Sequence, residues 1–212
     1  MFAVLSPAVT EQIHARVVGV ARERGVARGR KVRVDTTVVE SHVHYPTDST
    51  LLGDGIRVLT RGLVRIAAEC RSGAVDVVDH GRAVKHRLLE INRAAKSLTT
   101  AGRQRLRDGY AKLVALTRRV VRQTTDVLRR LAARRAKVVG DGLRVDAYAG
   151  ELRHYVPLVE QVIAQTNARV WGGDRHVPGK ILSLFEPHTQ VIRKGKAHKP
   201  NEFGRLVRLD EV

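Results

Sequence analysis

The chain has 212 residues, and its 39 Lys or Arg against 21 Asp or Glu give a formal net charge of +18. A single cysteine, Cys70, excludes an intrachain disulfide. No stretch approaches the roughly twenty apolar residues of a membrane span, and the first residues lack a signal-peptide pattern, so we expect a cytoplasmic protein without a membrane partner.

The first predicted element is a helix within residues 1–30. It begins at Ser6-Pro7, because Ser is a favoured N-cap and Pro is favoured at the first helical position. It ends near Gly25. One apolar stripe runs along it, made of Val9, Ile13, Val17 and Val20.

Residues 31–54 predict a strand followed by turns. Asp35 lies in the middle of the β-branched stretch 31–40. Taking its charge out of water is costly unless a cation, a metal or hydrogen bonds meet it. A carboxylate on a rigid strand is also a good metal ligand, because the scaffold fixes its position. We therefore predict that Asp35 is a metal ligand, and the alternative is a half-exposed Asp35 in an ion pair with a neighbouring Arg.

Turns are predicted at residues 45–49 and at Asp54-Gly55. Residues 55–168 then follow the 3.6-residue period of helices. After residue 168 the pattern changes to turns and short strands. The helices are expected at about 56–70, 81–100, 104–139 and 152–163, with Pro157 near the start of the last or at a kink, and the strands at 190–194 and 205–209. This order predicts an α/β (α+β) fold that is mainly helical overall.

The longest predicted helix combines an apolar seam with an excess of positive charge. From Arg103 to Lys137 there are twelve Lys or Arg and two Asp, a net +10. A merely solvated face would carry balanced ion pairs four residues apart, so the excess favours a polyanionic partner. GC-rich coding explains the preference for Arg over Lys but not the shortage of acids. The seam is formed by Leu113, Leu116, Val120, Thr124, Val127 and Leu131.

Two groups of cations are candidates for binding DNA, since the guanidinium group matches phosphate oxygens bidentately. The first group lies on the long predicted helix. The second lies at the end of the predicted strand 190–194 and in the segment after it. They are Arg118, Arg119, Arg122, Arg129, Arg130, Arg134 and Arg135, and then Arg193, Lys194, Lys196 and Lys199.

Two separated stretches carry a family resemblance. Residues 35–52, DTTVVESHVHYPTDSTLL, resemble the segment that opens the catalytic domain of DDE-type insertion-sequence transposases of bacteria. Residues 183–196, SLFEPHTQVIRKGK, followed by KPNEFG, are similar to a later segment of the same family. The resemblance implies a partial RNase H-like fold with a large basic helical insertion at 55–168. It also implies Asp35 as the first catalytic residue, Mg²⁺ or Mn²⁺ as cofactor, and transposon ends and target DNA as partners.

The chain departs from the family pattern in one important respect. In the family, the second Asp and the final Glu follow the strands that come after the second motif, whereas Asp210 and Glu211 occur too early. Only thirty-four residues precede Asp35, where the family has a helical DNA-binding region. We therefore expect residues 169–212 to be the following strands of an incomplete and inactive catalytic domain.

Three alternatives stay open. Glu40, His42 and His44 alternate on a strand and could form a metal site, although a solvated strand edge is the favoured explanation. The chain could instead be a non-catalytic basic helical module that binds DNA or RNA, with Asp35 in a structural ion pair. It could also be a homo-oligomer that associates through the seam of the long helix.

Overall fold

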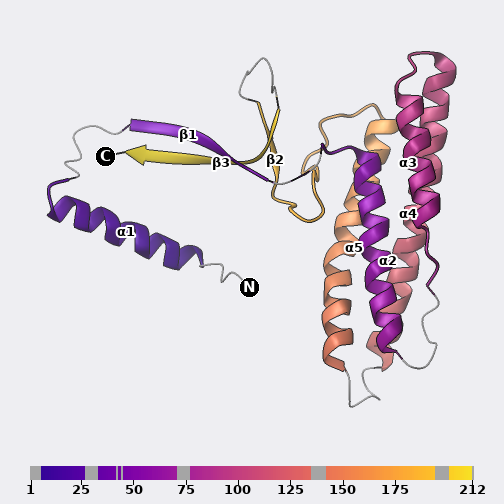
Figure 1. Cartoon of the computed structure of the whole chain (residues 1–212), viewed down its shortest axis with the longest axis horizontal. Coiled ribbons are helices and arrows are strands. Elements are labelled where there is room, and N and C mark those ends of the chain that lie inside the picture. Colours follow the sequence, from indigo (N-terminus) through magenta and orange to yellow (C-terminus); the bar gives the residue numbers. More distant parts are fainter. Residues whose placement is uncertain are drawn as a thin grey trace. The chain divides into compact units, whose positions relative to one another are not determined.

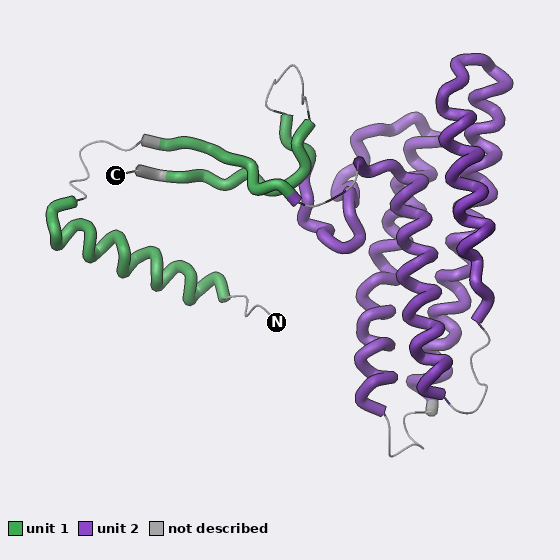
Figure 2. The backbone as a smooth tube through the Cα atoms, viewed as in Figure 1, with its two compact units in different colours: residues 1–40, 191–212 green, residues 41–190 purple. Residues whose placement is uncertain are grey.

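A computed structural model describes residues 6–26, 33–41, 43, 45–70, 77–134, 142–193 and 201–211 of the chain. The chain divides into two compact units, residues 1–40 with 191–212 and residues 41–190 (Figure 2). Helices dominate, and a small sheet accompanies them, so the predicted α+β class with mainly helical content is confirmed. The unit boundaries differ from the predicted ones at 54/55 and 168/169.

The larger unit is a helical bundle (Figure 1). Its described helices are α2 (Asp48–Glu69), α3 (Gly81–Ala95), α4 (Thr100–Arg134) and α5 (Gly142–Val170). α2 packs on α4 and α5, and α3 packs mainly on α4. Leu59 and Leu63 of α2, Leu113 of α4 and Leu152 of α5 are almost fully buried and lie in one hydrophobic core. None of the described helices is apolar over a stretch long enough to cross a bilayer.

The predicted turns at 45–49 and at Asp54-Gly55 are wrong where α2 replaces them. α2 begins at Asp48 because Thr47 and Thr50 form a reciprocal capping box, with backbone-to-hydroxyl hydrogen bonds of 3.1 and 3.2 Å. Gly55 lies inside the helix. A Cβ there would stand 2.9 Å from the nearest atom of Val159, so this glycine permits close packing of α5 rather than a turn.

The other helices lie where the sequence predicts them, but their lengths differ from the predicted ones. α3 ends at Ala95 rather than near residue 100, and α4 already begins at Thr100. The hydroxyl of Thr99 accepts a hydrogen bond from the backbone N–H of Gly102 (3.1 Å), which stabilises this earlier start. α5 is much longer than predicted and holds Pro157 in its interior. Proline lacks the N–H for one bond of the helix, but it does not end the helix here.

The smaller unit contains α1 (Pro7–Glu23) and the strands β1 (Arg33–Glu40) and β3 (Glu202–Glu211). The sheet has the order β1-β3-β2, where β2 spans Gln190–Ile192. β1 and β3 run antiparallel, and Asp35 lies opposite Leu209. Strands are therefore confirmed at all three predicted places. In the apolar stripe of α1, Val9, Ile13 and Val17 are exposed and Val20 is half-buried, and this helix buries no residue.

Candidate functional site

Asp35 lies on β1, as the sequence predicts, and is the third residue of this strand. Its carboxylate oxygen Oδ1 accepts a hydrogen bond of 2.7 Å from the backbone N–H of Thr36. The expectation of a buried charge is wrong, because Asp35 is exposed. Water reaches both faces of the strand. Val34 and Val39 point to opposite faces, and they are 50% and 57% exposed. Solvation therefore stabilises this carboxylate without a metal or a cation.

The described residues do not complete a metal site around Asp35. Among them, no group of three His, Cys, Asp or Glu side chains could hold an ion. In the strand register Asp210 lies opposite Val34 and Glu211 opposite Arg33, but the side chains of these two acids fall outside the described part. One carboxylate does not hold Mg²⁺ among phosphate charges, since several oxygen ligands must converge. A magnesium or manganese site is thus not formed by the residues that the structure describes.

The alternative metal site of Glu40, His42 and His44 lies partly outside the described residues. Glu40 is exposed at the end of β1, and His42 and His44 lie outside the described residues. For Asp35, no ion pair with a described residue is present, and the side chain of Arg33 is not among those described. The alternative of an ion pair between Asp35 and a neighbouring Arg therefore stays a prediction.

The two stretches that resemble transposases meet in the structure. Most of β1 belongs to the first stretch, and β1 pairs over its whole length with β3, which begins within the KPNEFG segment that follows the second. Close by in sequence, the hydroxyl groups of Ser41 and Thr189 form a hydrogen bond of 3.0 Å. Segments from opposite parts of the chain thus lie side by side, and the helical bundle connects them in sequence.

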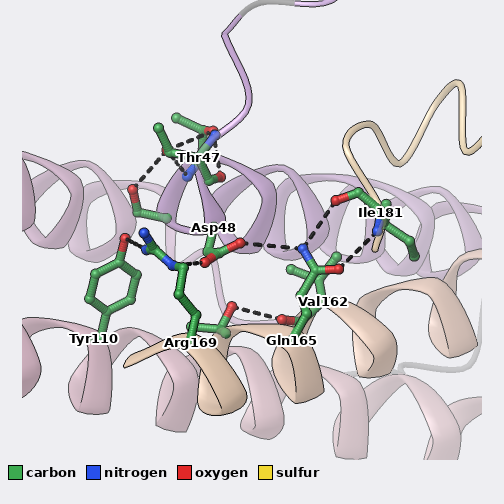
Figure 3. Close-up of polar contacts among 10 residues, drawn as sticks. Thr47, Asp48, Tyr110, Val162, Gln165, Arg169 and Ile181 are labelled. Atoms are coloured by element: carbon green, nitrogen blue, oxygen red, sulfur yellow. Dashed lines mark hydrogen bonds and ion pairs between the residues drawn. The ribbon is translucent and has the colours of Figure 1, made fainter. Parts of the chain in front are cut away.

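A buried polar network connects Asp48, one of the acidic residues of the first stretch, to the helical bundle. Asp48, the Asp of YPTDS, is 3% exposed and forms an ion pair with Arg169 of α5. Arg169 also donates a hydrogen bond of 2.7 Å to the hydroxyl group of Tyr110 on α4 (Figure 3). Asp48 lies at the N-terminus of α2, where the helix dipole favours a negative charge. Asp48 is therefore a structural residue that joins three helices.

Gln165 extends this network to the second stretch (Figure 3). Its side-chain amide donates to the Asp48 carboxylate (3.3 Å) and to the backbone carbonyl of Ile181 (3.0 Å). Its amide oxygen accepts from the backbone N–H of Ile181 (2.9 Å). Gln165 and Arg169 were not predicted from the sequence. The sequence signal that could have identified them is a pair of polar residues four positions apart, directly after the apolar part of the helix.

The predicted DNA-binding arginines of α4 lie on its exposed surface. Arg129 forms an ion pair with Asp126 (2.9 Å). The others whose side chains are described are exposed and form no ion pair with a described residue; they are Arg118, Arg119, Arg122 and Arg130. Arg193 is exposed after β2. The predictions for Arg135, Lys194, Lys196 and Lys199, and for the side chain of Arg134, fall outside the described residues.

The seam of α4 faces the inside of the bundle. Leu113 and Val120 are 0% exposed and Val127 is 5% exposed. Thr124 is buried as well, and its hydroxyl group donates to the carbonyl of Val120 (2.8 Å). Helices of the same chain cover these residues of the seam, and association with a second copy stays a prediction.

Fold and surface together define an α+β protein with a basic helical bundle and a small antiparallel sheet. No family model, no curated protein and no solved structure matches the chain.

Proposed function

We propose that this chain is a DDE-type transposase sequence with an RNase H-like strand, β1, and that Asp35 on it is the first catalytic carboxylate. The pairing of β1 with β3 carries this proposal. It brings the two stretches that resemble the family into one sheet, with Asp35 inside the paired region, opposite Leu209. Two motifs that meet in space are a stronger argument than two motifs in sequence alone.

In the family that the motifs resemble, water or a 3′-hydroxyl group attacks a phosphodiester at the end of the mobile element. The partner of this chain is then DNA, and its implied cofactor is Mg²⁺ or Mn²⁺. The described residues contribute one ligand, Asp35, whereas phosphodiester transfer with two ions needs several converging carboxylates. Accordingly, the 212-residue chain is expected to cut and join DNA poorly or not at all.

Paramagnetic line broadening by Mn²⁺ tests the role of Asp35 even if the ion binds weakly. Amide signals of the isotope-labelled chain are recorded during a manganese titration for the wild type, Asp35→Asn and the control Glu40→Gln on the same strand. Broadening is expected to centre on Thr36 and Leu209 in the wild type and the control, and to vanish there in Asp35→Asn. If all three proteins broaden alike, Asp35 is no metal ligand and the proposal fails.

The exposed position of Asp35 favours a second candidate function, a basic module that binds nucleic acid without catalysis. In that case, Asp35→Asn changes neither manganese binding nor DNA binding, and the arginines of α4 account for the affinity. Any strand cleavage that requires Mg²⁺ and disappears in Asp35→Asn argues against this candidate.

A further inference from the structure

The cations of α4 share one side of the helix. Successive residues are rotated by about 100°, so Arg118, Arg122 and Arg129 project within about 40° of one another. Arg119 and Arg130 follow on the adjoining side, and the five together cover an arc of about 120°. We call these five arginines the α4 cationic face. Buried residues such as Val120 and Thr124 occupy the opposite side, so core packing holds the face toward solvent.

The charge of this face is largely uncompensated within the described chain. Arg129 is paired with Asp126, and both side chains are exposed, at 73% and 51%. An exposed pair of this kind is worth little and is easily exchanged for another partner. The other four arginines have no ion pair with a described residue. A polyanion that releases its counterions on binding is the partner whose chemistry fits such a surface.

The absence of stacking groups on α4 favours a double strand over a single strand. Proteins that bind single strands stack bases on exposed aromatic side chains. Tyr110 is the single aromatic residue in the sequence of α4, and it is 4% exposed. Its hydroxyl group accepts a hydrogen bond from Arg169 and is therefore also engaged. The cationic face offers charge without a platform for bases.

The polar side chains of α4 also argue against sequence-specific contacts between this helix and the bases of DNA. Gln104 donates to Asp108 (2.9 Å), and the hydroxyl group of Thr125 donates to the carbonyl of Val121 (3.0 Å). Arginine reads guanine when neighbouring groups hold its guanidinium in place. Arg118, Arg119 and Arg122 have no such partner among the described residues, so they are suited to follow phosphates.

We propose that the α4 cationic face binds the phosphate backbone of double-stranded DNA independently of base sequence. The choice of DNA as the polyanion rests on the function proposed above. The bundle then supplies general affinity for DNA, and recognition of element ends belongs to another part of the protein. The proposal requires neither a metal ion nor Asp35.

The test is duplex binding, measured by fluorescence anisotropy of the full chain in EDTA over a range of salt concentrations. A quadruple variant changes Arg118, Arg119, Arg122 and Arg130 to Gln. Its matched control changes four exposed cations of other segments to Gln: Arg61, Lys85, Arg153 and Arg175. The α4 variant is expected to lose affinity about 100-fold at 0.1 M salt, and its log–log salt slope is expected to become less steep by about three to four. Circular dichroism checks that both variants stay helical.

Four probes of equal length complete the experiment: two DNA duplexes of different sequence, one DNA single strand and one RNA duplex. The two DNA duplexes are expected to bind within about threefold of each other and more tightly than the other two probes. Equal losses in the α4 variant and the control overturn the proposal, as does tighter binding of the single strand or the RNA duplex. A sequence preference above tenfold would also overturn it. Because the buffer lacks metal, these outcomes leave the manganese test of Asp35 untouched.

Discussion

Gln165 and Ile181 are joined by two hydrogen bonds, one from the side-chain amide to the carbonyl (3.0 Å) and one from the backbone N–H to the amide oxygen (2.9 Å). The glutamine side chain thus pairs with a backbone in the way a neighbouring strand does. Both residues are buried, so the contact fixes the segment after α5 onto the bundle. The second motif, which begins at Ser183, starts from this fixed point.

Gln165→Leu is expected to reduce the free energy of unfolding by about 2–4 kcal/mol, because it leaves the buried N–H and C=O of Ile181 unpaired. Urea denaturation followed by circular dichroism measures the change. The control is Gln161→Leu, one turn earlier, where an exposed glutamine donates to the carbonyl of Gly179. The control is expected to change stability by less than about 1 kcal/mol. Similar losses of unfolding free energy in both variants would show that the burial of Gln165 does not make its hydrogen bonds more important for stability.

The ion pair of Asp48 and Arg169 is expected to contribute more than a surface pair. Asp48→Ala leaves the guanidinium without its buried partner, and a loss of about 2–3 kcal/mol is expected, moderated because the Arg169 side chain is 37% exposed. Asp126→Ala, in the exposed pair with Arg129, is expected to lose at most about 1 kcal/mol. A double-mutant cycle for each pair isolates the coupling energy. A coupling below 0.5 kcal/mol for Asp48 and Arg169 refutes the structural role of Asp48.

Gly62 and Gly150 lie inside helices but differ in their surroundings. A Cβ at Gly62 would stand 2.5 Å from Leu152, whereas nothing lies within 4 Å of a Cβ at Gly150. Gly62→Ala is therefore expected to destabilise the bundle by about 1–3 kcal/mol through overpacking, despite the better helix propensity of alanine. Gly150→Ala is expected to stabilise it by up to about 1 kcal/mol. Thermal denaturation compares the two, and the prediction fails if they shift the midpoint in the same direction.

Val120→Asp is expected to unfold the bundle rather than to dissociate an oligomer. Val120 is 0% exposed, and burying a carboxylate there without a partner costs more than about 4 kcal/mol. Arg119→Asp at the adjacent exposed position is the control, and it is expected to remain folded. Circular dichroism with light scattering distinguishes the outcomes. A folded Val120→Asp protein of reduced mass would show that the seam joins two copies.

Glu90 is expected to titrate below its usual range. The hydrogen bond from Arg87 (2.6 Å) lowers the pKa of Glu90 from 4.5, and the charges of Arg87, His86 and Lys112 act in the same direction. A lowered pKa in the folded state means that the contribution to stability is present above pH 4.5 and is lost as the pH falls through the folded-state pKa. Carbon-detected NMR follows the carboxylate. Arg87→Gln is expected to raise the pKa, and Arg82→Gln on the same helix is expected to leave it unchanged.

Local patterns in the sequence determined the type and approximate place of most elements. The β-branched stretch around Asp35 predicts β1, and the Ser6-Pro7 start predicts α1. The seven-residue spacing of Leu113, Val120 and Val127 identifies the buried side of α4, and therefore also the exposed side with its arginines. These inferences succeed because a helix or a strand fixes the directions of nearby side chains.

Tertiary structure alone decided the rest, because it depends on contacts between residues far apart in the chain. In the sequence, Gly55 resembles a turn residue. In the structure it lies inside α2, at a point where α5 packs closely against that helix. Asp35 looks costly in sequence, yet it is solvated because both faces of its strand are exposed to water. Asp48, Arg169 and Gln165 acquire their roles only when three helices bring them together, and no periodicity along the chain encodes that meeting.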